Sequence, residues 1–180
     1  MTGGPVGTGG TEAGRIGVPL GFDVPAGWHA VDPASVGAAH AAFVLVRDSV
    51  PSGDFTPNIT IGVDRREEPG EVAELADESV DRLSDAVARI DVIDRQTVGD
   101  DTAPAITQVL RMRTKPGPAG PGRELVQSQV HLVIPLDDAP DDRLIVELAC
   151  TCLPTQTDAV IPDFQRLVAS FHIREREGTQ

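Results

Sequence analysis

The sequence predicts an α+β fold, in which a twisted antiparallel β-sheet of about six strands packs against two main helices. Three observations support this prediction. Several runs of residues alternate between apolar and polar side chains, as half-buried strands do. Two other segments place apolar residues three and four positions apart, which is the spacing along one face of a helix. Short turn segments separate the strand-like runs, and such connections join antiparallel neighbours.

The composition is that of one globular domain with an acidic surface. The chain has 180 residues, of which 40% are hydrophobic, and a formal net charge of −13. This length suits a single domain, which we expect over residues 16–173, between flexible tails at 1–15 and 174–180. The negative charge repels phosphate groups and anionic lipids, so it argues against binding to nucleic acid or to a membrane surface. Neither a secretion signal nor a membrane-spanning run is found, and we expect a cytoplasmic protein.

The first part of the domain predicts two hairpins. Residues 22–24 alternate, residues 25–27 form a turn, and Trp28 follows, which together predict a short N-terminal β-hairpin. We expect Trp28, the only tryptophan, to anchor the core. Residues 42–48 and 58–65 are apolar or alternating runs separated by a turn, and they predict a second hairpin with a longer loop.

The segment 71–90 predicts the clearest helix. Acidic residues in its first turn suit the positive end of the helix dipole, and more acidic residues follow along a solvated face. Its apolar face has the helical spacing and consists of Val72, Leu75, Ala76, Ser79, Leu83, Ala86, Val87 and Ile90.

The second half of the chain predicts four more strands and a closing helix. Residues 90–97 and 105–114 give two strands, and the Pro- and Gly-rich segment 115–122 gives a hairpin tip. Two long strands follow, one through residues 126–134 and one through 144–152. A helix is predicted within residues 156–173, with Pro162 in its first turn, where a missing N–H does no harm. We expect both helices to pack on one side of the sheet.

No motif in the sequence fixes a chemistry, so we expect no enzyme, no cofactor and no bound metal. Cys150 and Cys152 would lie on the same side of a strand, at the outer limit for a disulfide. A metal site would need further Cys or His ligands at a suitable spacing, and none is found. Buried structural thiols are therefore favoured over a metal or redox role. The four histidines show no ligand or catalytic spacing either.

The polar side of the central hairpin is the candidate site. If the two strands pair, their polar residues form a flat hydrogen-bonding surface beside the Pro- and Gly-rich tip. Such a surface is either an ordinary solvated sheet face or a docking face for a partner. The residues that we assign to partner binding, next to Thr107, are Arg111, Arg113, Gln127, Gln129 and His131.

Three sequence motifs resemble a known family. They are FDVPAGW near the start, FTPNITIGV before the long helix, and ACTCLPTQTDAVIPDFQRLVASFHI at the end. In this order, over residues 18–173, they resemble the LpqN/LpqT-type actinobacterial proteins and, more broadly, the PsbP/Mog-like fold, which also includes DcrB-like proteins. The resemblance implies a twisted antiparallel sheet with helices packed on it. It also implies a non-enzymatic role, as in envelope lipoproteins, accessory subunits and secretion chaperones, although the lipidated cysteine of the lipoprotein members is missing here.

Together these observations favour a non-catalytic protein-binding module. We expect a soluble adaptor or chaperone-like accessory protein, linked to secretion or the cell envelope, that binds a protein partner and has the option of forming a homodimer. The alternative is a carrier of a small molecule or lipid. Its pocket would lie between the sheet and the helices, lined by Leu83, Leu144, Val146 and Phe164.

Overall fold

The computed structural model describes residues 18–50 and 55–174, with the exception of residue 138. Within them the protein has the predicted α+β fold. The predicted tail at 1–15, and all but the first residue of the tail at 174–180, lie outside the described residues. The division of the chain into one domain and two tails therefore stays a prediction.

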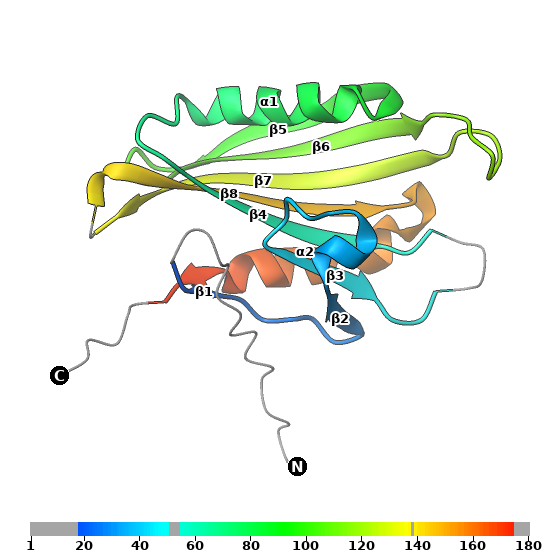
Figure 1. Cartoon of the computed structure of the whole chain (residues 1–180), viewed down its shortest axis with the longest axis horizontal. Coiled ribbons are helices and arrows are strands. Elements are labelled where there is room, and N and C mark those ends of the chain that lie inside the picture. The colour runs from blue at the N-terminus through cyan, green and yellow to red at the C-terminus, as the bar shows by residue number, and fades with distance from the viewer. Residues whose placement is uncertain (1–17, 51–54, 138, 175–180) are drawn as a thin grey trace, which may run out of the picture.

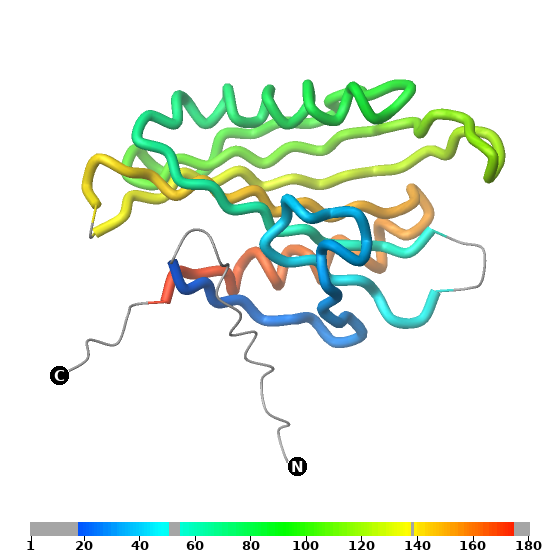
Figure 2. Tube along the Cα trace, in the orientation of Figure 1, coloured from blue at the N-terminus to red at the C-terminus, as the bar shows by residue number. Residues whose placement is uncertain are grey.

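The main sheet has seven antiparallel strands in the order β2-β3-β4-β8-β7-β6-β5 (Figure 1). β7 and β8 form the pair with the longest strands, and their traces run along most of the molecule (Figure 2). The sequence predicts the strands of this sheet and its antiparallel pairing correctly. The bounds of the strands are β2 Trp28–Val31, β3 Phe43–Arg47, β4 Asn58–Arg66, β5 Val87–Gly99, β6 Pro104–Thr114, β7 Glu124–Leu136 and β8 Ala139–Cys152.

Four helical segments and a small second sheet complete the described part of the chain. The two main helices are α1, Val72–Ser84, and α2, Thr157–Ser170, and the short 3₁₀ helices are η1, Pro33–Val36, and η2, Pro154–Gln156. The small sheet pairs β1, Leu20–Gly21, with β9, His172–Ile173.

β8 is buried on both of its sides. On one side its apolar residues join the main core, together with Ile59 and Ile61 of β4 and Phe164 of α2. On the other side Ile145 packs in a second cluster with Leu75 of α1. The side chains of β8 in the main core are Leu144, Val146, Leu148, Cys150 and Cys152.

The two helices therefore lie on opposite sides of the sheet, and the expectation that they share one side is wrong. α1 packs over β5, β6 and β7, whereas α2 packs over β8 and β7 from the other side (Figure 1). A strand whose side chains are apolar in both directions needs a cover on each side, and one helix can supply only one. We call the two sides of the sheet the α1 face and the α2 face.

The predicted short N-terminal hairpin does not form. β1 pairs with β9 near the C-terminus, and β2 pairs with β3 at the edge of the main sheet. The turn before β2 is present, with Gly27 at a φ of 81° and the N–H of Trp28 donating to the Pro25 carbonyl (3.2 Å). Leu20, however, packs into the main core, which draws β1 away from β2. Trp28 is the anchor that the sequence predicts: its side chain is buried, and its Nε1 donates to Asp163 Oδ2 of α2 (2.9 Å).

Both helices differ from their predicted limits. α1 ends at Ser84, and the chain enters β5 at Val87, because residues 87–99 pair with β6 along its whole length. α2 begins directly after η2, so Pro162 lies five residues inside it and not in its first turn. Its missing N–H leaves the Asp158 carbonyl without its usual helix partner.

Candidate functional site

The predicted partner-binding residues do not form one surface. Residues that lie opposite each other in an antiparallel pair point to the same side. Arg111 lies opposite Val126, whereas Gln129 lies opposite Gln108 and His131 lies opposite Ile106. The register therefore places Arg111 and Arg113 on the α2 face, but Gln127, Gln129 and His131 on the α1 face. All three of these α1-face residues are buried beneath α1.

A buried hydrogen-bond network holds the polar residues of the α1 face, and Gln129 is its centre. Gln129 Oε1 accepts from Gln108 Nε2 (2.6 Å) and lies 3.0 Å from His131 Nε2. Gln129 Nε2 donates to Ser79 Oγ of α1 (3.1 Å) and to Gln127 Oε1 (2.5 Å). These bonds fasten the middle of α1 to β6 and β7.

The network continues to both sides of Gln129. On one side Arg95 Nε donates to Gln108 Oε1 (2.9 Å). On the other side Gln127 Nε2 donates to Thr151 Oγ1 of β8 (2.8 Å). Throughout the described residues, no buried side-chain nitrogen or oxygen lacks a hydrogen-bond partner. The network is thus fully satisfied, as a stable buried polar cluster must be.

Glu147 is the carboxylate of this network that lies beside both Ser79 and His131, but it does not complete a catalytic triad. Ser79 Oγ donates to Glu147 Oε1 (3.3 Å), and Arg82 Nη2 pairs with Glu147 Oε2 (2.8 Å). His131 Nδ1 lies 4.0 Å from Glu147 Oε2, and burial lowers the pKa of His131. Because Ser79 is fully buried and donates to the carboxylate, it is not presented as a nucleophile.

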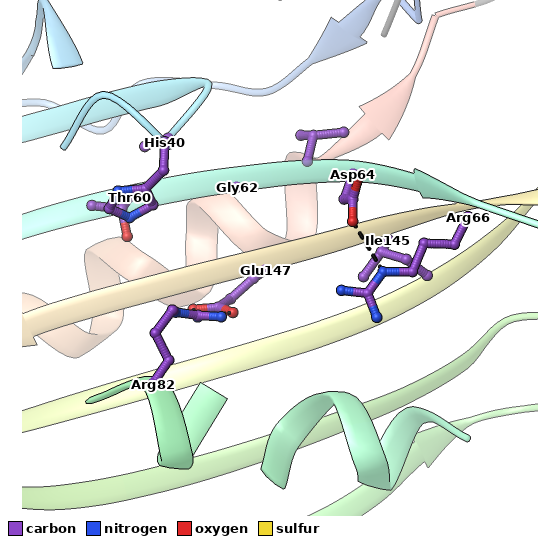
Figure 3. A pocket seen from close by; sticks show the side chains of 10 residues that line it. His40, Thr60, Gly62, Asp64, Arg66, Arg82, Ile145 and Glu147 are labelled. Carbon is purple, nitrogen blue, oxygen red and sulfur yellow. Dashed lines mark hydrogen bonds and ion pairs between the residues drawn. The ribbon is translucent and has the colours of Figure 1, made fainter. Parts of the chain in front are cut away.

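A polar groove of about 260 Å³ opens on the α1 face between α1 and β4 (Figure 3). Arg82 and Glu147 face each other at one side of it, and Arg66 reaches Asp64 at the other. Arg66 Nε lies 3.0 Å from Asp64 Oδ2, and its Nη1 lies 3.2 Å from Glu78 Oε2. The arginines of this groove are therefore already neutralised by acidic neighbours. The described residues contain no group of three or more side chains placed to hold a metal ion.

The α2 face is different, because α2 covers β8 and β7 and leaves β6 and β5 open. A cluster of charged side chains lies at one end of this open part. Arg89 pairs with Asp91 (2.8 Å), and Arg113 lies 4.0 Å from Glu124. Arg111 is exposed and lies opposite Asp91, but no carboxylate oxygen of the described residues lies within 4.0 Å of its guanidinium nitrogens. We call these five residues the arginine cluster.

Next to the arginine cluster, a groove of about 380 Å³ runs between α2 and the strands β6 and β7. Arg111 and Val109 are two residues apart on the same side of β6, so Arg111 stands about 7 Å along the strand from the groove. We call this the α2 groove. The side chains that line it are Thr107, Val109, Ser128 and Val130 from the sheet, and Ile161, Phe164, Gln165, Val168 and Ala169 from the helix.

The α2 groove is not the carrier pocket that the sequence suggests. Leu83 packs with residues of the α1 face, while Leu144 and Val146 lie in the main core on the α2 face. Of the four residues expected to line that pocket, only Phe164 lines the α2 groove.

β5 forms one edge of the main sheet and exposes apolar side chains. Its residues Val92, Ile93 and Val98 are 43%, 48% and 39% exposed. Five large hydrophobic side chains of the described chain are exposed to this degree, and these are three of them. Charged and polar residues lie between them, and a register shift interrupts the pairing at Val92 and Asp94. An edge of this kind is either protected against pairing or used for it.

The two cysteines are buried and not disulfide-bonded. Burial raises the pKa of Cys152 to about 11 and that of Cys150 further. Both thiols therefore stay protonated at neutral pH, which makes them poor nucleophiles and poor metal ligands. This agrees with the structural role that the sequence favours.

Comparisons with known proteins find similarity in structure only. No family model matches the chain, and no curated protein matches it. Among solved structures, LpqN of Mycobacterium tuberculosis, a protein involved in cell envelope biogenesis, is 13% identical with a TM-score of 0.61, over 87% of this chain and 83% of that chain. The Ran-binding protein Mog1p of Saccharomyces cerevisiae is 16% identical with a TM-score of 0.55, over 86% and 89%.

Cyanobacterial PsbP from Synechocystis is 18% identical with a TM-score of 0.52, over 86% of each chain. The fold is PsbP/Mog-like. Identities this low show similarity of fold alone. For the fold, the resemblance that the sequence motifs suggest is confirmed. In addition, no helix of the described chain is both long enough and apolar enough to cross a membrane.

The network predicts that Gln129→Leu destabilises the protein by about 2–4 kcal/mol. The substitution removes the donor to Gln127 Oε1, the shorter of the two bonds from Gln108 Nε2 and a partner of Ser79, and each buried group left unsatisfied costs about 1–3 kcal/mol. Urea unfolding measures the effect. The control is Gln96→Leu on the exposed side of β5, which should change stability by less than about 0.5 kcal/mol. Equal effects of the two variants would contradict the network.

His131 predicts a loss of stability in mild acid. In the unfolded chain it takes up a proton near pH 6.5, but burial keeps it neutral to lower pH in the folded state, against the opposing charge of Glu147. Below about pH 6.5 the unfolded state thus binds more protons than the folded state, so the free energy of unfolding decreases as the pH is lowered. Above that pH His131 is neutral in both states and adds no pH dependence to stability.

The His131→Gln variant retains a side chain that can donate to Gln129. Between pH 7.5 and pH 5 it should lose less stability than the unaltered protein, as measured by urea unfolding. His172→Gln, at an exposed histidine, serves as the matched control. A pH dependence identical in all three proteins would show that His131 is not held neutral.

Proposed function

We propose that the protein is a non-catalytic accessory module of the cytoplasm that binds a protein partner through the β5 edge of its main sheet and the neighbouring part of the α2 face. The observation that carries the proposal is the exposure of Val92, Ile93 and Val98 on one edge strand. Val92 lies opposite Leu110 on the α1 face and Val98 lies opposite Ala105 on the α2 face, so apolar side chains are exposed on both sides of this edge, where an added strand would contact them. The two free, buried thiols suit a reducing compartment.

The surroundings of β5 support a protein partner. Among the described strands β5 pairs only with β6, so its outer backbone groups are available to an added strand. On the α2 face, the arginine cluster and the α2 groove lie on the strands next to it. This end of the sheet thus offers apolar contacts, charges and backbone groups together, which is the composition of a protein interface.

The polar network and the thiols do not compete with this proposal. The network is buried and internally satisfied, so its role is to hold α1 on the sheet. The arginines of the polar groove already have acidic partners.

Among the structural neighbours, yeast Mog1p is named for binding Ran, and LpqN is linked to cell envelope biogenesis, so a binding role on this fold has precedent. For this chain, a role in secretion or in the envelope is part of the proposal.

A second candidate is a small-molecule or lipid carrier, and the α2 groove favours it. Its volume of about 380 Å³ falls within the range of ligand sites, and its lining is mainly apolar. The groove is open along its length, whereas carriers usually enclose most of the ligand surface. For this reason we rank the carrier second.

A photo-crosslinking amino acid placed at Gln96 should capture the partner in cells of the native host. Gln96 is exposed on β5, on the α2 face. His29, which is exposed on the opposite edge strand β2, is the control position and should give no adduct. Adding Ile93→Asp should abolish the adduct at Gln96 without lowering the melting temperature, because Ile93 is half exposed.

Equal adducts at Gln96 and His29 would contradict the proposed surface, and so would an adduct that persists with Ile93→Asp. The absence of any adduct would contradict protein binding.

A further inference from the structure

We propose that the α2 groove and Arg111 together receive an extended segment of the partner, with a carboxylate at one end and apolar side chains after it. The inference deepens the proposed protein-binding function and rests on it. It gives Arg111 a role in binding, whereas Gln127, Gln129 and His131, which the sequence pattern groups with it, are buried on the α1 face.

The groove has the length of a short peptide. Its helical wall extends over the nine residues from Ile161 to Ala169, which is about 12 Å of helix. An extended chain covers this distance with about three or four residues. Phe164 lies buried at the base of the helical wall, and Val109 lines the wall formed by the sheet. Apolar side chains of the segment would find their contacts there.

Charge fixes which end of the segment is acidic. Arg89 pairs with Asp91, and Arg113 lies near Glu124. Asp91 also lies opposite Arg111, but no carboxylate oxygen of the described residues lies within 4.0 Å of the Arg111 guanidinium, which therefore forms no ion pair. An exposed guanidinium beside an apolar groove is well suited to hold a carboxylate, which it can bind through two hydrogen bonds. Further along, Asp94 lies opposite Val109 on β5, so a second carboxylate over the groove would be repelled. The acidic residue therefore lies at the Arg111 end, and the apolar residues occupy the rest of the groove.

The polar residues of the lining favour a peptide over an acyl chain. Thr107, Ser128 and Gln165 lie along the same groove. Their hydroxyl and amide groups can hydrogen-bond to the N–H and C=O groups of an extended peptide. An acyl chain has no such groups, and it would cover these side chains without offering partners.

The test starts from a library of random decapeptides displayed on phage, which makes no assumption about the sequence. It is selected on the full chain and counter-selected on the Arg111→Gln variant. The expected result is enrichment of peptides in which Asp or Glu lies at one end of a run of two or more apolar residues, in a single chain direction or in both. Enrichment of basic or uncharged peptides would overturn the inference, and so would a failure to enrich any peptide.

The most enriched peptide is then measured by fluorescence anisotropy. Arg111→Gln should weaken its binding about tenfold, as expected for a charged pair at the edge of an apolar contact. The matched control is Arg66→Gln, at a partly exposed arginine of the α1 face, which should change binding by less than about twofold. Equal losses in both variants would overturn the assignment of Arg111.

Decanoate in the same assay separates the two occupants of the groove. If decanoate displaces the peptide at micromolar concentration and itself requires Arg111, the groove is a carrier site and the inference fails. Crosslinking at Gln96 gives an independent answer about the function. A protein captured there through a basic or uncharged segment would contradict the inference but leave protein binding in place, whereas the absence of both adduct and peptide would end both.

Discussion

The burial of β8 on both sides is the constraint on which the rest of the structure depends. Its even-numbered residues from Leu144 to Cys152 belong to the main core, and Ile145 belongs to a second cluster on the other side. A strand of this kind is stable only inside a sheet that is covered on both faces. Hydrophobic burial thus sets β8 between β4 and β7 and directs α1 and α2 to opposite faces. The two faces then acquire different properties.

On the α1 face, the helix lies over polar residues and the structure satisfies them internally. Gln108, Gln127 and Gln129 bond to one another and to Ser79, so that α1 is held by directional contacts in addition to apolar ones. On the α2 face, the helix covers only the centre of the sheet. β5 and β6 remain open there, with Arg111 and an apolar groove side by side. The surface available for recognition is the part of the sheet that the second helix does not reach.

Periodicity in the sequence predicts most of the fold. The strands of the main sheet, their antiparallel pairing and the buried side of α1 follow from alternation, short connections and helical spacing, whereas these patterns do not predict the order of the strands. The pairing of β1 with β9 cannot be predicted from local sequence, because it depends on contacts between segments far apart in the chain. The end of α1 is also misplaced, since Val87 and Ile90 continue the helical spacing but pair with β6 in the structure.

The candidate site is harder to predict, for a physical reason. Residues of two strands share a face according to their register, and one strand's alternation does not reveal its register with the next. Arg111 and Gln129 are therefore grouped by polarity in the sequence and separated by the sheet. A polar row also has the same pattern whether water or a helix covers it. The two apolar sides of β8 are the available signal that a second helix is needed on the α1 face.

The most direct test of this account compares two isosteric cysteine variants, Ser128→Cys and Ser79→Cys. Ser128 lines the α2 groove, whereas Ser79 is fully buried on the side of α1 that faces the sheet. The native Cys150 and Cys152 are buried and serve as the internal background. The rate of maleimide labelling under native conditions is the measurement. The account predicts rapid labelling at position 128, which bound partner slows, and labelling at position 79 only after unfolding. Equal rates at the two positions, or faster labelling at position 79, would contradict it.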